Sequence, residues 1–404
     1  MDSLFSRRNA LILAGLVLLS LNLRPAAVSV GPVLAEVRHG LGMGGATTGL
    51  LTSLPVLAFA CFGALAPTLA ARLGVHRVTL GALLAVVVGL GARAVAPGEL
   101  TFLVFSMVAL SGMAMANVLL PSLVKQHFPD RVGPVTALYT GSLSIGLTAA
   151  LMATVPISEA AGSWRWGLGT WSLLALAAAL PWLVLAGHDR ALERAPQEVR
   201  LAEVARTRLG LGMALAFGLQ SMQAYIIFGW FAQLWRDAGY SPTQAGLLVG
   251  LVAATSIPLS LWLPPLLARS TRPGLVLGSV VLCYPVAYVG LMVAPHDLAI
   301  LWAVVTGAGT TTFPLVLTLI GLRARSAGGT AALSGFTQSA GYLMAALGPF
   351  TIGLLYDATD GWTIPLLLIL VLTLPLLLVC LYVARPAYVE DQLRDPRLSG
   401  DAAR

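Results

Sequence analysis

Long apolar runs separated by short polar segments make up most of this 404-residue chain. A helix that crosses the bilayer core needs about 20 mostly apolar residues. Twelve runs satisfy this requirement: 10–36, 45–71, 78–97, 100–124, 134–157, 166–187, 209–235, 243–268, 274–294, 297–322, 330–356 and 362–384. The first run follows Arg7 and Arg8 directly, and at about 25 residues it exceeds the apolar core of a signal peptide. The pattern predicts an all-α membrane protein with twelve transmembrane helices.

The composition agrees with a lipid-exposed surface. Hydrophobic residues make up 57% of the chain and charged residues only 10%, against about 25% charged in a typical soluble domain. The mean hydropathy is +0.86. This small number of ionised groups could not cover a water-exposed surface of this size. The lipid bilayer is therefore an expected partner.

The basic residues near the span ends predict the orientation. Nineteen of the 24 basic residues fall on one side of the twelve spans. These nineteen are Arg7, Arg8, Arg72, Arg77, Lys125, Arg131, Arg190, Arg194, Arg200, Arg206, Arg208, Arg269, Arg272, Arg323, Arg325, Arg385, Arg394, Arg397 and Arg404. Since basic residues concentrate on the cytoplasmic side, both termini are expected in the cytoplasm of a bacterium, with the spans in its inner membrane. The arginines separate apolar runs and do not cluster on a polar face, so nucleic-acid binding is not expected despite the net charge of +7.

One long polar stretch, His188–Arg208, divides the chain into two halves of six spans each. The predicted organisation is an N-terminal six-helix bundle at 1–187, a cytoplasmic linker at 188–208, a C-terminal bundle at 209–385 and a cytoplasmic tail at 386–404. Short matches relate the halves in the same order, such as 49–51 with 246–248 and 137–138 with 332–333. These matches predict two parallel repeats that are related by a rotation of about 180° around the membrane normal.

Cysteine, histidine and phosphate-binding patterns give no sign of a cofactor, a metal or a catalytic group. Cys61, Cys283 and Cys380 each lie inside an apolar run, without a Cys-x-x-Cys or Cys/His spacing. The sequence contains no Gly-Lys-Ser/Thr loop that would suggest ATP-driven transport. Its serine, histidine and aspartate residues also lack the sequence context of a catalytic triad. We therefore expect no cofactor and no enzyme.

Three stretches carry a family likeness: Asn22-Leu23-Arg24-Pro25 followed by Val30-Gly31-Pro32, then Gly49 to Val56, then Asn117 to Lys125. Over nearly the whole chain the sequence resembles the cyanate permease and nitroimidazole transporter family of the major facilitator superfamily. The resemblance implies two pseudo-symmetric six-helix bundles, alternating access and secondary active transport of a small anion (cyanate-like) or a small polar organic molecule. The loop after the second span departs from the superfamily pattern, because Ala71 occupies the aspartate position.

Arg24 is the strongest single candidate for chemistry. It lies about 14 residues into the first span, roughly 21 Å along a helix axis, where an uncompensated charge costs several kcal/mol. All 17 acidic residues fall in loops or at span ends, with Glu36 and Asp357 the closest candidates for protonation. A guanidinium without a carboxylate partner is suited to bind an anion. The alternative is a structural arginine that binds carbonyls freed by Pro25 and Pro32. Arg93, near the outer end of the third span, is expected to snorkel to the interface.

The remaining candidates are neutral polar residues on spans that line the central seam in the resembled family. Such groups can bind a substrate or hold helices together. The predicted substrate-binding set is Arg24, Asn22, Asn117, Tyr139, Gln220, Gln223, Tyr225, Thr311, Gln338 and Tyr342.

Other functions stay open at this stage. The family's nitroimidazole members keep open an exporter of nitroimidazole-like or other drug-like compounds. A receptor or scaffold without flux is a second alternative. An intramembrane enzyme is a third, although the embedded acid, histidine pair or serine/lysine dyad that it would need is not seen. The expected partners are a small-molecule or small-anion substrate and lipid, and the protein is expected to be a monomer.

Overall fold

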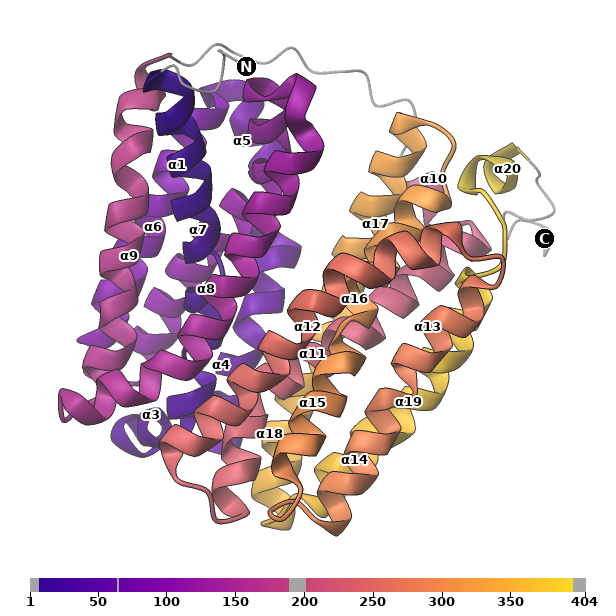
Figure 1. Ribbon diagram of the computed structural model, residues 1–404. Coiled ribbons are helices and arrows are strands. Elements are labelled where there is room, and N and C mark those ends of the chain that lie inside the picture. The colour runs from indigo at the N-terminus through magenta and orange to yellow at the C-terminus, as the bar shows by residue number, and fades with distance from the viewer. Residues whose placement is uncertain (1–6, 64, 189–200, 395–404) are drawn as a thin grey trace. The chain divides into compact units, whose positions relative to one another are not determined.

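The computed structural model describes residues 7–63, 65–188 and 201–394, and its regular elements there are all helices (Figure 1). Twelve segments of this described part are long and apolar enough to cross a membrane. They are Asn9–Leu41, Gly45–Gly63, Val75–Ala94, Glu99–His127, Pro134–Ala160, Trp164–Leu185, Arg208–Asp237, Pro242–Arg269, Pro273–Val293, Ala299–Leu322, Gly328–Thr359 and Thr363–Val383. The prediction of a twelve-span α-helical membrane protein is confirmed. The second span is shorter than the predicted 45–71, because a separate helix covers residues 66–73.

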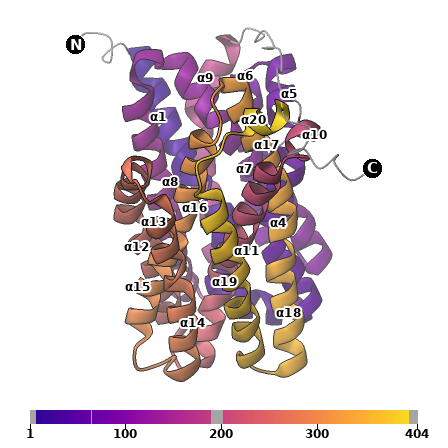
Figure 2. The same cartoon turned by 90° about the vertical axis from the view of Figure 1, so that its right-hand side faces the viewer.

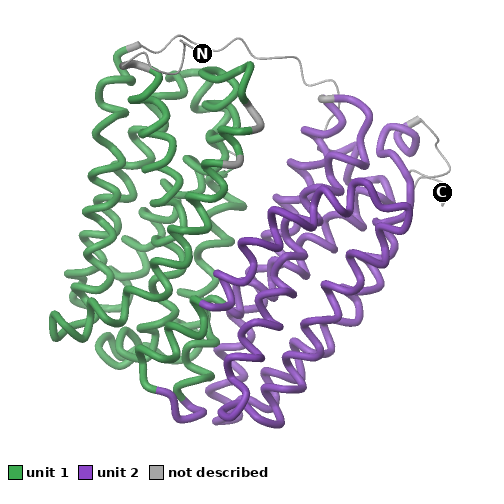
Figure 3. Tube along the Cα trace, in the orientation of Figure 1, with its two compact units in different colours: residues 1–194, 228–236, 241–250 green, residues 195–227, 237–240, 251–404 purple. Residues whose placement is uncertain are grey.

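The chain forms two compact units (Figure 3). Unit 1 comprises residues 1–194, 228–236 and 241–250, and unit 2 comprises residues 195–227, 237–240 and 251–404. The predicted linker residues 189–200 and tail residues 395–404 lie outside the described residues. Unit 1 thus includes residues 228–236 and 241–250, which come from the second half of the sequence.

Unit 1 is built from the first nine α-helices. These are α1 (Arg7–Asn22), α2 (Pro25–Val28), α3 (Leu34–Leu41), α4 (Gly45–Ala58), α5 (Ala66–Leu73), α6 (Val75–Ala94), α7 (Glu99–His127), α8 (Val132–Ala160) and α9 (Trp164–Leu185). Short 3₁₀ or π turns join them: η1 (Gly31–Val33), η2 (Phe59–Gly63), η3 (Pro129–Arg131) and η4 (Ala186–His188). Small residues let α6 and α7 pack closely, because a Cβ on Gly89 would overlap the backbone of Ala109.

Unit 2 holds the remaining helices and shares two long ones with unit 1. The shared helices are α11 (Arg208–Asp237) and α12 (Pro242–Arg269). The others are α10 (Leu201–Val204), α13 (Pro273–Val281), α14 (Cys283–Val293), α15 (Ala299–Thr310), α16 (Thr312–Leu322), α17 (Ala327–Ala345), α18 (Leu347–Thr359), α19 (Thr363–Val383) and α20 (Val389–Arg394). Figure 2 shows α10, α17 and α20 together at one end of this unit.

Prolines divide three spans of unit 2 into two helices each. Proline has no N–H group, so it cannot donate to the carbonyl four residues earlier. The helices α13, α15 and α17 end at Val281, Thr310 and Ala345, four residues before Pro285, Pro314 and Pro349. These three prolines account for the breaks beside them, whereas α12 continues through Pro258, Pro264 and Pro265 and α19 through Pro375.

Candidate functional site

The first span breaks at Arg24. Helix α1 ends at Asn22, and α2 begins at Pro25, which cannot donate to the carbonyl of Leu21. The carbonyl of Arg24 itself accepts the backbone N–H groups of Ala27 and Val28, at 3.0 and 3.1 Å. Arg24 therefore lies at the break between α1 and α2.

The side chain of Arg24 is half-buried. Within the described residues, no hydrogen bond or ion pair joins its guanidinium to another residue. The alternative in which the guanidinium binds carbonyls freed by Pro25 and Pro32 therefore has no such bond to support it in this part of the chain. The arrangement leaves a cationic, planar donor group at the break between α1 and α2.

Arg93 on α6 contacts the same broken segment. Its two terminal nitrogens donate to the carbonyl of Ala26 and to the hydroxyl of Ser29, at 3.1 and 3.0 Å. Its side chain is 0% exposed, so the prediction that Arg93 snorkels to the interface is wrong. The reason is that its guanidinium binds groups of the broken first span and does not turn to the interface, while Arg165 on α9 donates to the carbonyls of Ala94 and Ala96 at the end of α6.

Helix α8 completes the surroundings of the break. A Cβ on Gly146 would overlap the carbonyl oxygen of Leu21, the one that Pro25 leaves without a helical donor. Asn22 is 1% exposed, and neither atom of its amide has a hydrogen-bond partner among the described residues. Asn117 on α7 and Tyr139 on α8 are half-buried.

Two predicted glutamines on α11 lie in the interior of unit 2. Gln223 donates to the carbonyl of Ile369 at 3.0 Å and accepts the hydroxyl of Tyr288 at 2.7 Å. Gln220 accepts the hydroxyl of Ser221 at 3.2 Å. Both glutamines are at most 1% exposed. The amide of Gln223 therefore contributes to packing of α11 against α14 and α19.

Thr311 lies at the break between α15 and α16. Thr310, Thr311 and Thr312 each donate a hydroxyl to a carbonyl of the preceding turn. Thr311 is 0% exposed. Such bonds satisfy carbonyls near the break before Pro314, which is a structural role.

A pair of aromatic side chains connects α11 and α17. The rings of Tyr225 and Tyr342 meet edge to face with centroids 6.4 Å apart, and Gln338 donates to Ser334 at 2.7 Å. Tyr225 and Gln338 are half-buried, whereas Tyr342 is 5% exposed.

Exposure divides the predicted set into two groups. The half-buried residues are Arg24, Asn117 and Tyr139 in unit 1 and Tyr225 and Gln338 in unit 2. The buried residues are Asn22 in unit 1 and Gln220, Gln223, Thr311 and Tyr342 in unit 2. Each group is defined on its own unit, and the substrate roles of all these residues stay predictions.

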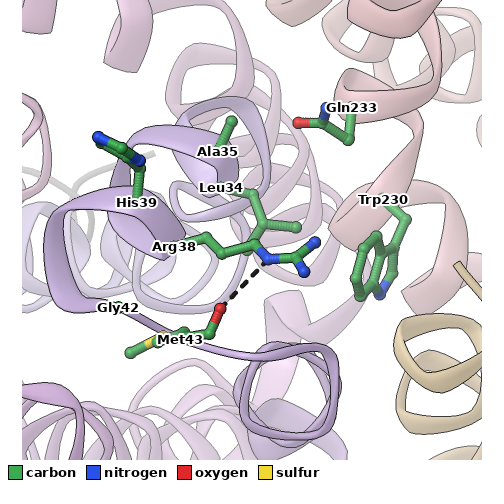
Figure 4. A pocket seen from close by; sticks show the side chains of 8 residues that line it. All are labelled: Leu34, Ala35, Arg38, His39, Gly42, Met43, Trp230 and Gln233. Atoms are coloured by element: carbon green, nitrogen blue, oxygen red, sulfur yellow. Dashed lines mark hydrogen bonds between the residues drawn. The ribbon is translucent and has the colours of Figure 1, made fainter. Parts of the chain in front are cut away.

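The end of unit 1 near α3 contains a cavity that the sequence did not indicate. It has a volume of ≈ 330 Å³ and lies between α3 and α11, with Leu34, Arg38, Trp230 and Gln233 in its wall (Figure 4). The guanidinium of Arg38 points toward Trp230, and its Nε donates to the carbonyl of Met43 at 3.2 Å.

Two polar contacts connect elements at this end of unit 1. Glu36 and Arg236 form an ion pair with both oxygens engaged at 2.7 Å, and the indole of Trp230 donates to Thr52 at 3.1 Å. Glu36 was considered as a proton carrier from sequence, but here its carboxylate is paired. A pair 200 positions apart leaves no local signal, so only the fold reveals it.

Within the described residues, no group of three His, Cys, Asp or Glu side chains could hold a metal ion. Cys61, Cys283 and Cys380 are free thiols. The predicted set itself consists of one cation, Arg24, and neutral amides and hydroxyls, which suit reversible binding.

Comparisons with known proteins agree over most of the chain. Residues 10–345 match the Major Facilitator Superfamily. The 2-nitroimidazole transporter of Escherichia coli (strain K12) is 35% identical over 379 residues, covering 92% of this chain and 95% of that protein. The cyanate transport protein CynX of the same organism is 26% identical over 348 residues, covering 86% and 90%. The crystal structure of the nucleoside transporter NupG has a TM-score of 0.74 at 14% identity, covering 93% of this chain and 100% of that one, which shows the fold alone.

Proposed function

Since the chain belongs to the major facilitator superfamily, a family of secondary transporters and not of enzymes, we propose that it moves a small anion across the bacterial inner membrane. The predicted family resemblance and the predicted fold are confirmed by the same matches. The finer proposal is that the substrate is a cyanate-like anion or a small polar organic molecule, carried by alternating access.

Arg24 is the observation that carries this proposal. Its guanidinium lies within a membrane-spanning segment, is half-buried, and has no carboxylate partner among the described residues. Burying a charge without a counter-charge is costly, and an anionic substrate would supply one. The planar fork of N–H donors also matches the acceptors of a small planar or linear anion.

The surrounding groups support recognition of a small polar solute. Asn117 and Tyr139 in unit 1, with Tyr225 and Gln338 in unit 2, offer amides and hydroxyls on half-buried surfaces. Neutral donors and acceptors fix the orientation of a ligand without the desolvation cost of additional charges.

A drug-like substrate is the second candidate. The 35% identity to a 2-nitroimidazole transporter over 92% of this chain favours it, and it would make the protein an exporter of nitroimidazole-like compounds. The two candidates differ in the charge of the substrate, so a comparison of anionic and neutral ligands separates them.

The remaining organisation is part of the same proposal. We infer two transport bundles at 1–187 and 209–385, a linker at 188–208 and a tail at 386–404, in a monomer with both termini in the cytoplasm. The asymmetry of basic residues supports the orientation.

The test is a ligand screen on Arg24 variants. Purified protein is examined by thermal shift against cyanate, nitrite, benzoate and 2-nitroimidazole, and affinities are then measured for those that stabilise it. Arg24→Ala should weaken anion binding about 10- to 150-fold, because a charge-assisted hydrogen bond contributes roughly 1.5–3 kcal/mol. Arg24→Lys should recover only part of the affinity, since an ammonium lacks the planar fork.

Arg72→Ala, at an exposed arginine of α5, is the matched control and should bind like the unmodified protein. Normal anion binding by a folded Arg24→Ala variant would refute the proposal. A response to 2-nitroimidazole alone, unchanged by Arg24→Ala, would favour the exporter.

A further inference from the structure

Arg93 carries a charge deep in unit 1, and its hydrogen bonds go to neutral groups. Its guanidinium is 0% exposed and donates to the carbonyl of Ala26 and the hydroxyl of Ser29. Its Nε has no hydrogen-bond partner among the described residues. These contacts are with dipoles and not with a carboxylate.

Dipoles stabilise a buried cation locally, but they do not cancel its charge. The last turn of α6 adds a further favourable dipole, since Arg93 lies at the helix C-terminus. The field of the full positive charge still extends beyond these groups, and a low-dielectric interior screens it weakly.

The charged groups on the neighbouring helices do not neutralise this field. Arg165 on α9 lies next to Ala94 and adds a second positive charge. Glu99, in the first turn of α7, is exposed to solvent. The α2 segment and η1 contain no acidic residue. In the described part of the chain, Arg93 has no ion-pair partner.

Arg24 and Arg93 lie at the same short stretch of backbone. Arg24 immediately precedes α2, and Arg93 binds the carbonyl of Ala26, two residues further along. We propose that Arg93 is a charge-selectivity residue, which supplies a buried positive charge at the segment that directly follows Arg24 and so makes this site select anions over neutral molecules of the same shape. In this division Arg24 contacts the substrate, while Arg93 acts on it through the electric field.

The inference deepens the proposed function, but its first test needs no ligand. Arg24→Cys in a background without the three native cysteines places a thiol where the guanidinium was. The thiolate, which is the reactive form, should be favoured by the positive charge of Arg93. The rate of reaction with neutral methyl methanethiosulfonate is measured from pH 6 to 10. Adding Arg93→Gln, which keeps a hydrogen-bond donor and removes the charge, should lower the rate at neutral pH about tenfold.

Two further variants separate charge from positioning. Arg93→Lys keeps the charge and should keep the rate profile near that of Arg24→Cys alone. Ser29→Ala removes one hydrogen bond of Arg93 without removing charge and should leave the profile unchanged. A change below about twofold on Arg93→Gln, or an equal change on Ser29→Ala, would overturn the proposal.

A comparison within the folded protein covers the case in which Arg93→Gln does not fold. Asn117→Cys places a thiol at another half-buried position of unit 1, on α7. With Arg93 intact, the thiol at position 24 must reach half its maximal rate at a lower pH than the thiol at position 117. Equal profiles would refute the role of Arg93.

A ligand-binding measurement forms a second test, and this test rests on the proposed function. Arg93→Gln should weaken benzoate binding about tenfold and leave binding of its neutral isostere benzamide within about twofold. If benzoate does not bind the unmodified protein but the thiol profiles shift as expected, the role of Arg93 stands and the anion substrate falls. If benzoate binds and both ligands weaken equally, Arg93 is structural.

Discussion

Glycine at position 146 determines how closely α8 approaches the break in the first span. Its backbone lies against the carbonyl of Leu21. That carbonyl receives no helical hydrogen bond, because Pro25 has no N–H group. The position of Arg24 thus depends on a residue that carries no chemistry of its own. Any side chain at position 146 would have to push the two helices apart.

A matched pair of glycine substitutions tests this dependence. Gly146→Ala should destabilise the protein by about 1–3 kcal/mol through overpacking and weaken ligand binding at Arg24. Gly141→Ala, on the same helix, places its Cβ where no atom lies within 4 Å, and it should be neutral or slightly stabilising. Thermal unfolding and ligand affinity are measured for both variants. Equal behaviour of the two would contradict this account of the break.

At this scale the sequence predicted charge in the membrane better than it predicted burial. Arg24 could be recognised because an arginine far from both ends of an apolar run is rare. The burial of Arg93 could not, because it depends on contacts with Ala26 and Ser29, which lie 67 and 64 positions away. Gln223 shows the same limit: its partners Ile369 and Tyr288 lie 146 and 65 positions away.

At the scale of elements, a short terminal helix closes one end of unit 2. Val389 in α20 is 0% exposed, and its N–H donates to the carbonyl of Arg323 at 2.9 Å. Gln392 accepts the N–H of Leu209 at 2.9 Å. Helix α20 therefore joins the start of α11 to the loop before α17, although its sequence was predicted only as part of a polar tail.

Proline breaks have a local cause, although the apolar pattern predicted 10–36 and 297–322 each as one uninterrupted span. Chain breaks at Pro25 and Pro314 follow from one missing N–H group each, which is a local property. Helix α20 has only six residues and no apolar stripe long enough to stand out, so its existence depends on contacts with Arg323 and Leu209. The helix α10, in the predicted linker, is undetectable in sequence for the same reason.

The docking of α20 should depend on pH through Glu390. Burial raises the pKa of this carboxyl group, but hydrogen bonds from the N–H groups of Ser326, Arg325 and Glu390 itself and from the Ser326 hydroxyl outweigh burial and place the pKa below its ordinary value of 4.5. A carboxylate with a depressed pKa stabilises the docked helix above that ordinary value, and the stabilisation is lost as the pH falls through the depressed pKa.

Hydrogen exchange measures this effect directly. Protection of the amides in 389–394, corrected for intrinsic exchange, should fall between pH 6 and pH 3.5. Glu390→Gln should show reduced protection at pH 6 and little further loss on acidification. Asp297→Asn, at an exposed carboxylate elsewhere, should behave like the unmodified protein. Loss of protection with the same pH profile in Glu390→Gln would assign the effect to another group.

At the scale of the whole molecule, span number was predictable and the grouping of residues was only partly so. Apolar length is set by the bilayer, and this is why all twelve spans could be counted from the sequence. The assignment of 228–236 and 241–250 to unit 1 could not be anticipated. It arises from contacts such as Arg236 with Glu36 and Trp230 with Thr52, which no periodic pattern encodes.

The orientation of the whole molecule remains a prediction from the basic residues, and labelling in intact cells tests it. Single cysteines are introduced into a background without native cysteines by Gln197→Cys in the linker, Ser399→Cys in the tail and Asp297→Cys between the ninth and tenth spans. Since 19 of 24 basic residues lie on the side of the linker and tail, an impermeant maleimide should label only the variant at position 297. All three should react after the cells are permeabilised, which controls for the accessibility of each thiol. Asp297 has a side chain that is 88% exposed, so lack of labelling there in intact cells cannot be attributed to burial. Labelling at 197 and 399 without labelling at 297 would reverse the orientation, and the cavity beside Arg38 would then open to the cytoplasm.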